Sequence, residues 1–165
     1  DTTALVGTPE TVAQALLDEL GRVEPLVVTR TKSGEEYRDT LNRIRFFVSA
    51  DVGMGEFMIK NFEAMACGCV LLAYDQGAAE NQALGLQDMH NVVFYQDIAQ
   101  LQEKLARLRS EPQLAQSIAR NGRELAVNQF SFARIGQRIV EELEPALRPR
   151  APLSLLERIR LNLGI

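Results

Sequence analysis

The sequence predicts an α/β fold, a parallel sheet of about five strands with helices on both faces and a C-terminal helical tail. Short apolar runs alternate with helix-length segments as far as residue 95, the pattern of strands joined by helical crossovers. The run at 26–29 is apolar almost throughout, like a strand that is covered on both faces. Beyond Asp97 the apolar residues follow helical spacing only.

The expected strands and helices follow from these patterns in order. Strands are predicted over residues 3–7, 26–29, 44–49, 69–74 and 91–95. Helices are predicted over residues 8–20, 34–42 and 59–67, and then in three segments that begin near 97, 112 and 131. Asp97 and Gln100 have the spacing of a capping box, which marks the start of the first of these three segments.

Proline residues divide the end of the chain from the rest. Pro145, Pro149 and Pro152 precede an amphipathic segment at 155–163. We therefore expect a Rossmann-like domain over 1–147, and a linker with an amphipathic helix over 148–165. That helix either packs on another part of the protein or makes a peripheral membrane contact, with Arg158 and Arg160 supporting the second alternative.

Composition excludes several classes of function. The chain has 165 residues with a net charge of −4, which argues against a nucleic-acid-binding face. Cys67 and Cys69 are one residue apart, a poor spacing for a disulfide, and no cluster of Cys or His completes a metal site. Without a secretory signal or an apolar run of ~20 residues, a cytoplasmic location is expected. The chain starts without Met almost directly in a strand, which suggests a domain of a longer protein.

A glycine turn after the third strand is the strongest functional signal from the residues alone. Gly53 and Gly55 stand where a helix should begin, so backbone amides could approach a phosphate. Glu63 then lies in that helix, where a carboxylate can meet ribose hydroxyls. Glu56, Lys60 and Glu63 would share one polar helical face. The alternative is a tight connection followed by a solvated Glu56–Lys60 ion pair.

Several stretches together resemble one protein family. They are residues 47–49, 55–71 with the block Glu63-Ala64-Met65-Ala66-Cys67-Gly68, the strand at 91–95 and the helices between 101 and 142. In these stretches the chain resembles the C-terminal half of retaining, GT-B-type glycosyltransferases of the group 1 superfamily. The block is the most specific part of the likeness.

The resemblance implies a fold and an activity. Family members have two Rossmann-like halves; the C-terminal half binds a nucleotide-diphosphate sugar and the N-terminal half binds the acceptor. The chain is then expected to be the donor-binding half of a metal-independent, hexosyltransferase-type enzyme without a cofactor. Its substrates would be a UDP- or GDP-sugar and a saccharide or lipid-linked acceptor in polysaccharide or glycan biosynthesis, in the cytoplasm or at the inner face of the membrane.

The resemblance also implies roles for individual residues. Glu63 would hold the donor ribose, and Gly53, Gly55, Lys60, Gly77 and Arg30 would lie near the diphosphate. The chain itself supplies no catalytic residue by this comparison. The acceptor-binding half is missing from this chain, so the isolated domain is expected to be inactive.

The chain departs from the family pattern at two places. The family's other glutamate falls on Gly55 here, with Glu56 one residue late as a shifted second carboxylate. The basic residues expected after the first strand are absent, and Arg30, Lys32 or Lys60 would have to replace them. A non-catalytic domain that binds protein or carbohydrate on the same scaffold is therefore a second hypothesis. A sugar-nucleotide epimerase or a phosphorylase is a third.

Overall fold

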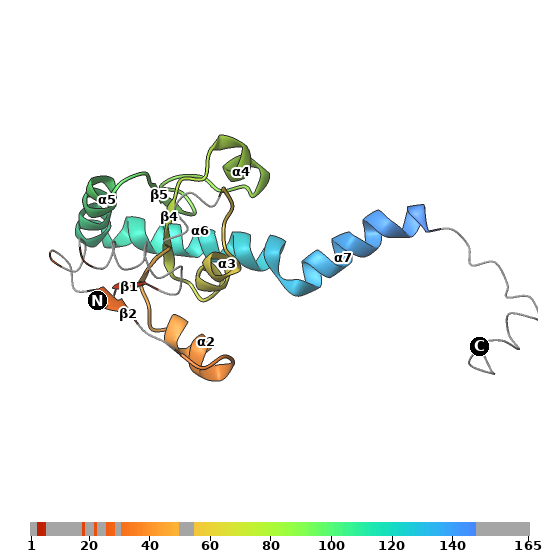
Figure 1. Ribbon diagram of the computed structural model, residues 1–165, viewed down its shortest axis with the longest axis horizontal. Helices are drawn as coiled ribbons and strands as arrows, with labels where there is room; N and C mark the ends of the chain where they lie inside the picture. The colour runs from red at the N-terminus through yellow and green to blue at the C-terminus, as the bar shows by residue number, and fades with distance from the viewer. Residues whose placement is uncertain are drawn as a thin grey trace, which may run out of the picture. The chain divides into compact units, whose positions relative to one another are not determined.

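The computed structural model describes residues 3–5, 18, 22, 26–28, 31–49 and 55–147, with 3–5 and 26–28 described in their backbone only. A parallel sheet of five strands, in the order β2-β1-β3-β4-β5, forms its centre (Figure 1). The strands are β1 (Thr3–Leu5), β2 (Leu26–Val28), β3 (Phe46–Val48), β4 (Val70–Tyr74) and β5 (Val93–Tyr95). The predicted fold class is confirmed, and all five expected strands are present with shorter bounds.

Helices follow the strands in the expected alternation. They are α2 (Glu35–Leu41), α3 (Ile59–Ala66), α4 (Ala78–Ala83), α5 (Ile98–Ser110), α6 (Pro112–Phe130) and α7 (Phe132–Leu143), with a short 3₁₀ turn at Glu144–Ala146. The short α4 was not among the expected elements. The expected helix at 8–20, apart from the single residue Asp18, and the segment 148–165 lie outside the described residues.

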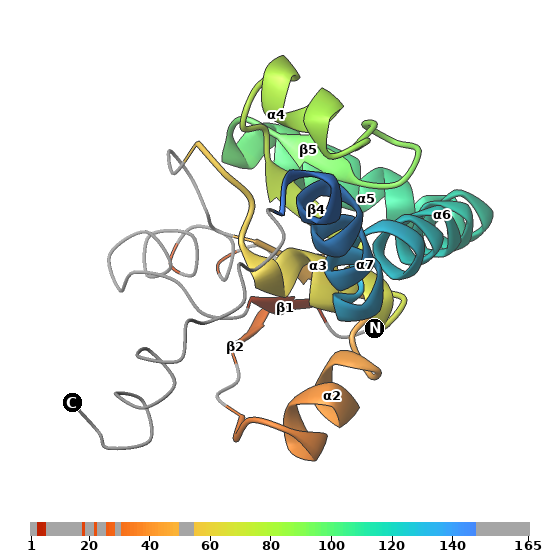
Figure 2. The same cartoon turned by 90° about the vertical axis from the view of Figure 1, so that its right-hand side faces the viewer.

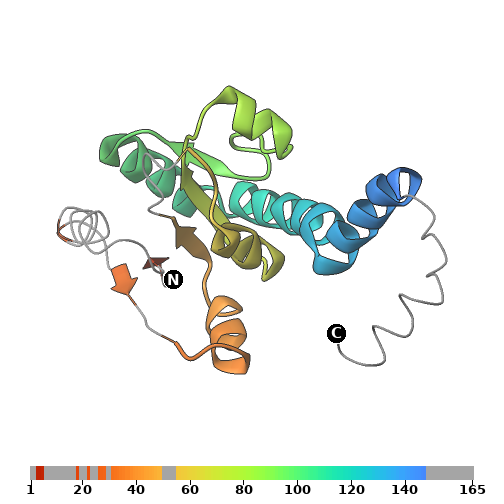
Figure 3. The same cartoon turned by 45° about the vertical axis from the view of Figure 1, so that its right-hand side comes forward.

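The alternation of side chains along each strand builds two hydrophobic cores, one on each face of the sheet. Phe46, Val48 and Leu72 face α5 and the start of α6. Phe47 and Leu71 face α2, α3 and the later part of α6. Figures 1 and 3 show α5 on one side of the sheet and α3 on the other. Both faces of β3 and β4 are therefore buried, as their apolar sequences predict.

Helix α6 contributes to both cores, so it passes along one edge of the sheet. Ala115 and Ile118 belong to the first core, whereas Ala126 belongs to the second. Between them, Gly122 lies against the loop before β5, where a Cβ atom would come within 2.7 Å of the Asn91 carbonyl oxygen. Because Asn91 precedes β5, this is the amino-terminal edge. Glycine at this position permits the close approach.

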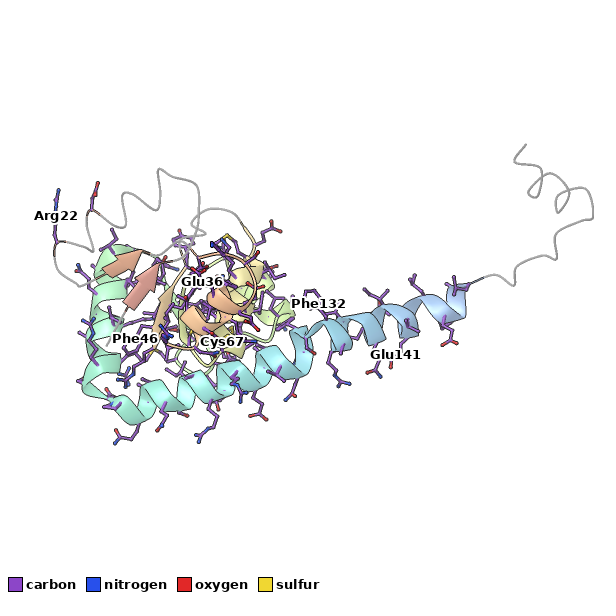
Figure 4. All side chains as sticks on the ribbon, turned by 90° about the horizontal axis from the view of Figure 1, so that it is seen from below. Arg22, Glu36, Phe46, Cys67, Phe132 and Glu141 are labelled. Carbon is purple, nitrogen blue, oxygen red and sulfur yellow. The ribbon has the colours of Figure 1, made fainter. Side chains whose placement is uncertain are left out.

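Helix α7 belongs to a second unit, which begins at Phe132. Its polar face carries a ladder in which Arg134 donates to Gln137 Oε1 at 3.1 Å and Gln137 donates to Glu141 Oε1 at 2.7 Å. Phe132 and Glu141 project from different sides of the helix (Figure 4). The apolar side is exposed, Phe132 to 85% and Ile139 to 51%. Taken by itself, α7 is strongly amphipathic.

Candidate functional site

The carboxyl ends of the strands meet at one edge, where open parallel sheets bind ligands. The strand order reverses between β1 and β3, which places the switch point of the sheet next to Ser49. Ser49 donates its backbone N–H to Leu72 O at 2.8 Å, and its carbonyl accepts a hydrogen bond from the Tyr95 hydroxyl. The ends of β3, β4 and β5 are thus tied together. Figure 2 shows α4 beyond the edge where β4 ends.

Asp75 organises the turn after β4. Its Oδ1 accepts from the Gly77 backbone N–H at 3.0 Å and from Asn81 Nδ2 at 2.8 Å. The Asn81 and Gly77 hydrogen bonds hold the pKa of the Asp75 carboxyl below its usual value. Gly77 has a φ of 107°, which a side chain would strain. The result is a fixed glycine turn that leads into α4.

Gln76 joins this turn to the one after β3. Its Oε1 accepts from the Gly55 backbone N–H at 3.0 Å. Gly55 has a φ of 74°, and a Cβ atom built on either Gly55 or Gly77 would meet no atom within 4 Å. The structure therefore brings Gly55 and Gly77 to one edge with open space beside their backbones. Both N–H groups are already donated within the protein.

The start of α3 differs from the sequence prediction. Glu56 lies in a bend before the helix, which begins at Ile59, so the shared helical face of Glu56, Lys60 and Glu63 is wrong. The physical reason is the buried Phe57 side chain, which packs at a ring-centroid distance of 6.1 Å from Phe94 and keeps this segment out of the helix. Glu56 is exposed and Lys60 is partly exposed.

Glu63 lies in the second turn of α3 and is partly buried. Its Oε2 accepts a hydrogen bond of 2.8 Å from the hydroxyl of Tyr37, which comes from α2. Burial, and then the adjacent Glu63 carboxylate, raise the pKa of Tyr37 far above its ordinary value, so the hydroxyl keeps its proton. The Glu63 carboxylate thus has one oxygen occupied by a fixed donor.

Sequence reasoning missed Tyr37. The residue lies on the side of α2 that packs against the second core, as Leu41 one turn later does. A tyrosine in such an apolar stripe needs a partner for its hydroxyl, and this was the available signal. The partner itself was not predictable, since it lies in a different helix.

Two polar groups near this edge are buried without a hydrogen-bond partner among the described residues. They are the Ser49 hydroxyl and Asn81 Oδ1. Most buried polar atoms in proteins are paired with protein or with ordered water. At this edge of the sheet, the Ser49 hydroxyl and Asn81 Oδ1 are therefore buried polar atoms whose hydrogen-bonding capacity the described residues do not satisfy.

Other residues singled out in the sequence have structural roles. Cys69 donates its thiol to Leu41 O at 3.3 Å, and burial raises the pKa of Cys69 to about 12. Burial and then Glu63 raise the pKa of Cys67, so neither thiol is activated. His90 is exposed, and its carbonyl accepts a 3.0 Å hydrogen bond from Asn121. Within the described ranges no cluster of His, Cys, Asp or Glu has the composition to hold a metal ion.

A cavity of about 320 Å³ lies on the opposite, amino-terminal side of the sheet. Arg45 and Val70 line it from the starts of β3 and β4, and Pro112, Gln116 and Ala119 line it from α6. It is therefore remote from the strand ends where Gly55 and Gly77 lie. Gly53 and Arg30, two further residues expected to bind the diphosphate, lie outside the described residues. No helix among the described residues has the length and apolar character needed to cross a membrane.

Comparison with known proteins supports the same architecture. Residues 15–141 match the family model described as glycosyl transferase-like. The structure is similar to the C-terminal domain of LpcC, a glycosyl transferase group 1 family protein from Francisella tularensis. The TM-score is 0.57 at 20% identity, over 79% of this chain and 70% of that one. No curated protein matches the chain.

The structure is also similar to sucrose-phosphate synthase from Thermosynechococcus elongatus. The TM-score is 0.62 at 18% identity, and the match covers 87% of this chain. The chain corresponds to only 38% of the length of that enzyme. At these identities the two likenesses establish the fold.

Proposed function

Because this chain belongs to the glycosyl transferase-like family, whose model matches residues 15–141, we propose that it is the donor-binding half of a GT-B-type glycosyltransferase. It would bind a nucleotide-diphosphate sugar, UDP- or GDP-linked, whose hexose passes to a saccharide or lipid-linked acceptor held by another domain. The observation that carries this proposal is the Glu63 carboxylate, partly buried on the helix that follows the glycine turn.

Each proposed contact has a physical basis. A carboxylate oxygen has two lone pairs, so the oxygen of Glu63 that Tyr37 leaves free can accept from ribose hydroxyls. The open space beside Gly55 and Gly77 lets a diphosphate approach the backbone. Lys60, one turn before Glu63, would supply a positive charge. Gly53 and Arg30 remain candidates on the grounds of sequence alone.

We propose that donor binding needs no metal ion. The family resemblance implies that helix termini and basic side chains stabilise the departing diphosphate, and Lys60 is the basic candidate in the described part of the chain. Since the acceptor is proposed to be held by another domain, we expect no turnover from these 165 residues by themselves. Binding of the nucleotide, rather than activity, is then the property to measure.

The test is calorimetric titration of the chain with UDP, GDP and ADP, each with and without EDTA. Binding of at least one nucleoside diphosphate that survives EDTA is expected. Binding lost with EDTA would contradict the metal-independent part of the proposal. Failure of all three nucleotides to bind would exclude a donor-binding half.

A non-catalytic binding domain is the second candidate, and Gly55 favours it. In the family pattern this position is a glutamate, whereas here it is a glycine in the left-handed region whose N–H is held by Gln76. A chain that binds an oligosaccharide and no nucleotide in the same titrations would support this candidate.

A further inference from the structure

The Tyr37–Glu63 hydrogen bond joins two helices on the same face of the sheet. Tyr37 lies in α2 and Glu63 in α3, and both helices pack on the core that contains Phe47 and Leu71. The hydroxyl donates to Oε2 at 2.8 Å, and the contact is partly buried. Since each helix is anchored in the core, the donor and the acceptor are both held by rigid elements.

A glutamate side chain on a helix surface samples several rotamers. Ordering such a side chain costs up to about 1.5–2 kcal/mol of rotamer entropy. A hydrogen bond from a fixed donor restricts the carboxylate before any ligand arrives, so less entropy is lost when a ligand binds. Oε2 is the oxygen that Tyr37 holds, which leaves Oε1 for another donor.

The protonation state of Tyr37 supports this arrangement. Burial and then the Glu63 carboxylate raise the pKa of Tyr37, which keeps the hydroxyl protonated, and therefore a donor, at neutral pH. A neutral donor fixes the carboxylate without cancelling its charge.

We propose that Tyr37 is the positioning residue of the donor site: it fixes one oxygen of Glu63 and thereby presents the other to the vicinal hydroxyls of a ribonucleotide. This inference rests on the proposed function, since it assigns Tyr37 to the same site. Tyr37 acts through Glu63 and has no contact of its own with the ribose. Its contribution is therefore tied to the ribose hydroxyls.

The experiment measures Kd by calorimetry for the nucleoside diphosphate that binds most tightly and for its 2′,3′-dideoxy counterpart. The proteins are wild type, Tyr37→Phe, Tyr37→Leu and a matched control, Thr40→Val. Thr40 is on the same helix as Tyr37. The Thr40→Val variant loses a hydroxyl that donates to the backbone carbonyl of Glu36 and not to Glu63. Thermal unfolding of each variant shows whether it folds.

Both Tyr37 variants are expected to bind the ribonucleotide about threefold to tenfold more weakly than wild type, because the released Glu63 side chain then loses part of its rotamer entropy when the ligand binds. Their affinity for the dideoxynucleotide should equal that of wild type, because this ligand lacks the ribose hydroxyls that would donate hydrogen bonds to Glu63. Thr40→Val should bind both ligands as wild type does.

The outcomes separate the two proposals. If wild type binds no nucleotide, the proposed function fails and the role of Tyr37 fails with it. If wild type binds the ribonucleotide but the Tyr37 variants bind it equally well or more tightly, only the positioning role is overturned. An equal loss of affinity for the ribonucleotide and the dideoxynucleotide would likewise overturn it, because the effect would then be structural.

Discussion

At the scale of single residues, Glu63 carries the most specific chemistry of the site. Its carboxylate combines partial burial with a fixed hydrogen-bond donor, so its position is more restricted than that of a solvated glutamate. Glu63 is only partly buried, whereas the neighbouring Ala64 and Met65 are fully buried in the core. Binding and folding can therefore be separated at this position.

Glu63→Ala should weaken binding of a nucleoside diphosphate by about tenfold or more, because hydrogen bonds to a charged group contribute about 1.5–3 kcal/mol. The free energy of unfolding should change by less than about 1 kcal/mol. Calorimetric titration and urea denaturation measure the two effects. Unchanged affinity would remove Glu63 from the site. Glu103→Ala, on an exposed residue of α5, removes the same charge elsewhere and serves as the control for long-range electrostatics.

Gly122 and Gly136 form a matched pair of helical glycines with opposite expectations. At Gly122 a Cβ atom would meet the Asn91 carbonyl oxygen at 2.7 Å. A Cβ atom at Gly136 would meet no described atom outside its own helix within 4 Å. Gly122→Ala should lower the free energy of unfolding by about 1–3 kcal/mol through overpacking against backbone. Denaturation curves of the variant and wild type measure this loss.

Gly136→Ala should instead raise helix content, because alanine is favoured over glycine inside a helix by about 0.5–1 kcal/mol. Circular dichroism measures that change. Equal effects of the two substitutions on stability would contradict the close approach of α6 to the loop before β5.

At the scale of elements, the turn after β4 is held by one carboxylate. Asp75 accepts hydrogen bonds from the Gly77 backbone and from Asn81, and these lower its pKa in the folded protein. A carboxyl with a depressed folded pKa contributes stability above its unfolded pKa of about 3.9. That contribution disappears as pH falls through the lower, folded value.

Asp75→Asn should therefore be less stable than wild type at neutral pH, and the difference should shrink as pH falls below about 4. Urea denaturation of both proteins at several pH values measures it. Asp97 caps α5 by accepting a hydrogen bond of 2.8 Å from the Gln100 backbone N–H, so Asp97→Asn is a useful comparison. A difference at Asp75 that stays constant with pH would contradict the argument.

The elements also show why sequence patterns predict some features and miss others. The alternation of Phe46, Phe47 and Val48 is set by nearest neighbours along the strand, and so is the Asp97 cap, which is confirmed by its hydrogen bond to Gln100. The late start of α3 depends on the burial of Phe57 against Phe94 in a distant strand. Helical spacing alone cannot show such a contact.

The site follows the same division. The position of the Glu63 carboxylate on the helix after the glycine turn was predictable from the sequence, and its role in donor binding stays a prediction. Its partner Tyr37 was not predictable, since α2 and α3 come together only in the folded sheet. The internal use of the Gly55 and Gly77 amides was likewise hidden, because Gln76 and Asp75 accept them through side chains. Local patterns locate a site, and tertiary contacts decide which of its atoms remain available.

At the scale of the whole molecule, the chain divides into two units of different character. The first contains the sheet and both cores, in which residues such as Leu105 and Phe47 are almost wholly buried. The second contains α7, whose apolar side is exposed among the described residues. Stability of the first unit should therefore depend chiefly on the buried side chains of its own two cores.

A triple variant, Phe132→Ser, Ile139→Gln and Leu143→Gln, tests this division. These side chains are exposed to 85%, 51% and 54%, so replacing them removes little buried apolar surface from the folded protein. The free energy of unfolding, followed by the fluorescence of Tyr37 in α2, Tyr74 in β4 and Tyr95 in β5, should change by less than about 0.5 kcal/mol. Leu105→Ala, at 1% exposure, is the contrasting control and should cost about 2–5 kcal/mol. A loss in the triple variant as large as that of the control would mean that α7 is part of the same cooperative core, because only buried apolar surface contributes on that scale.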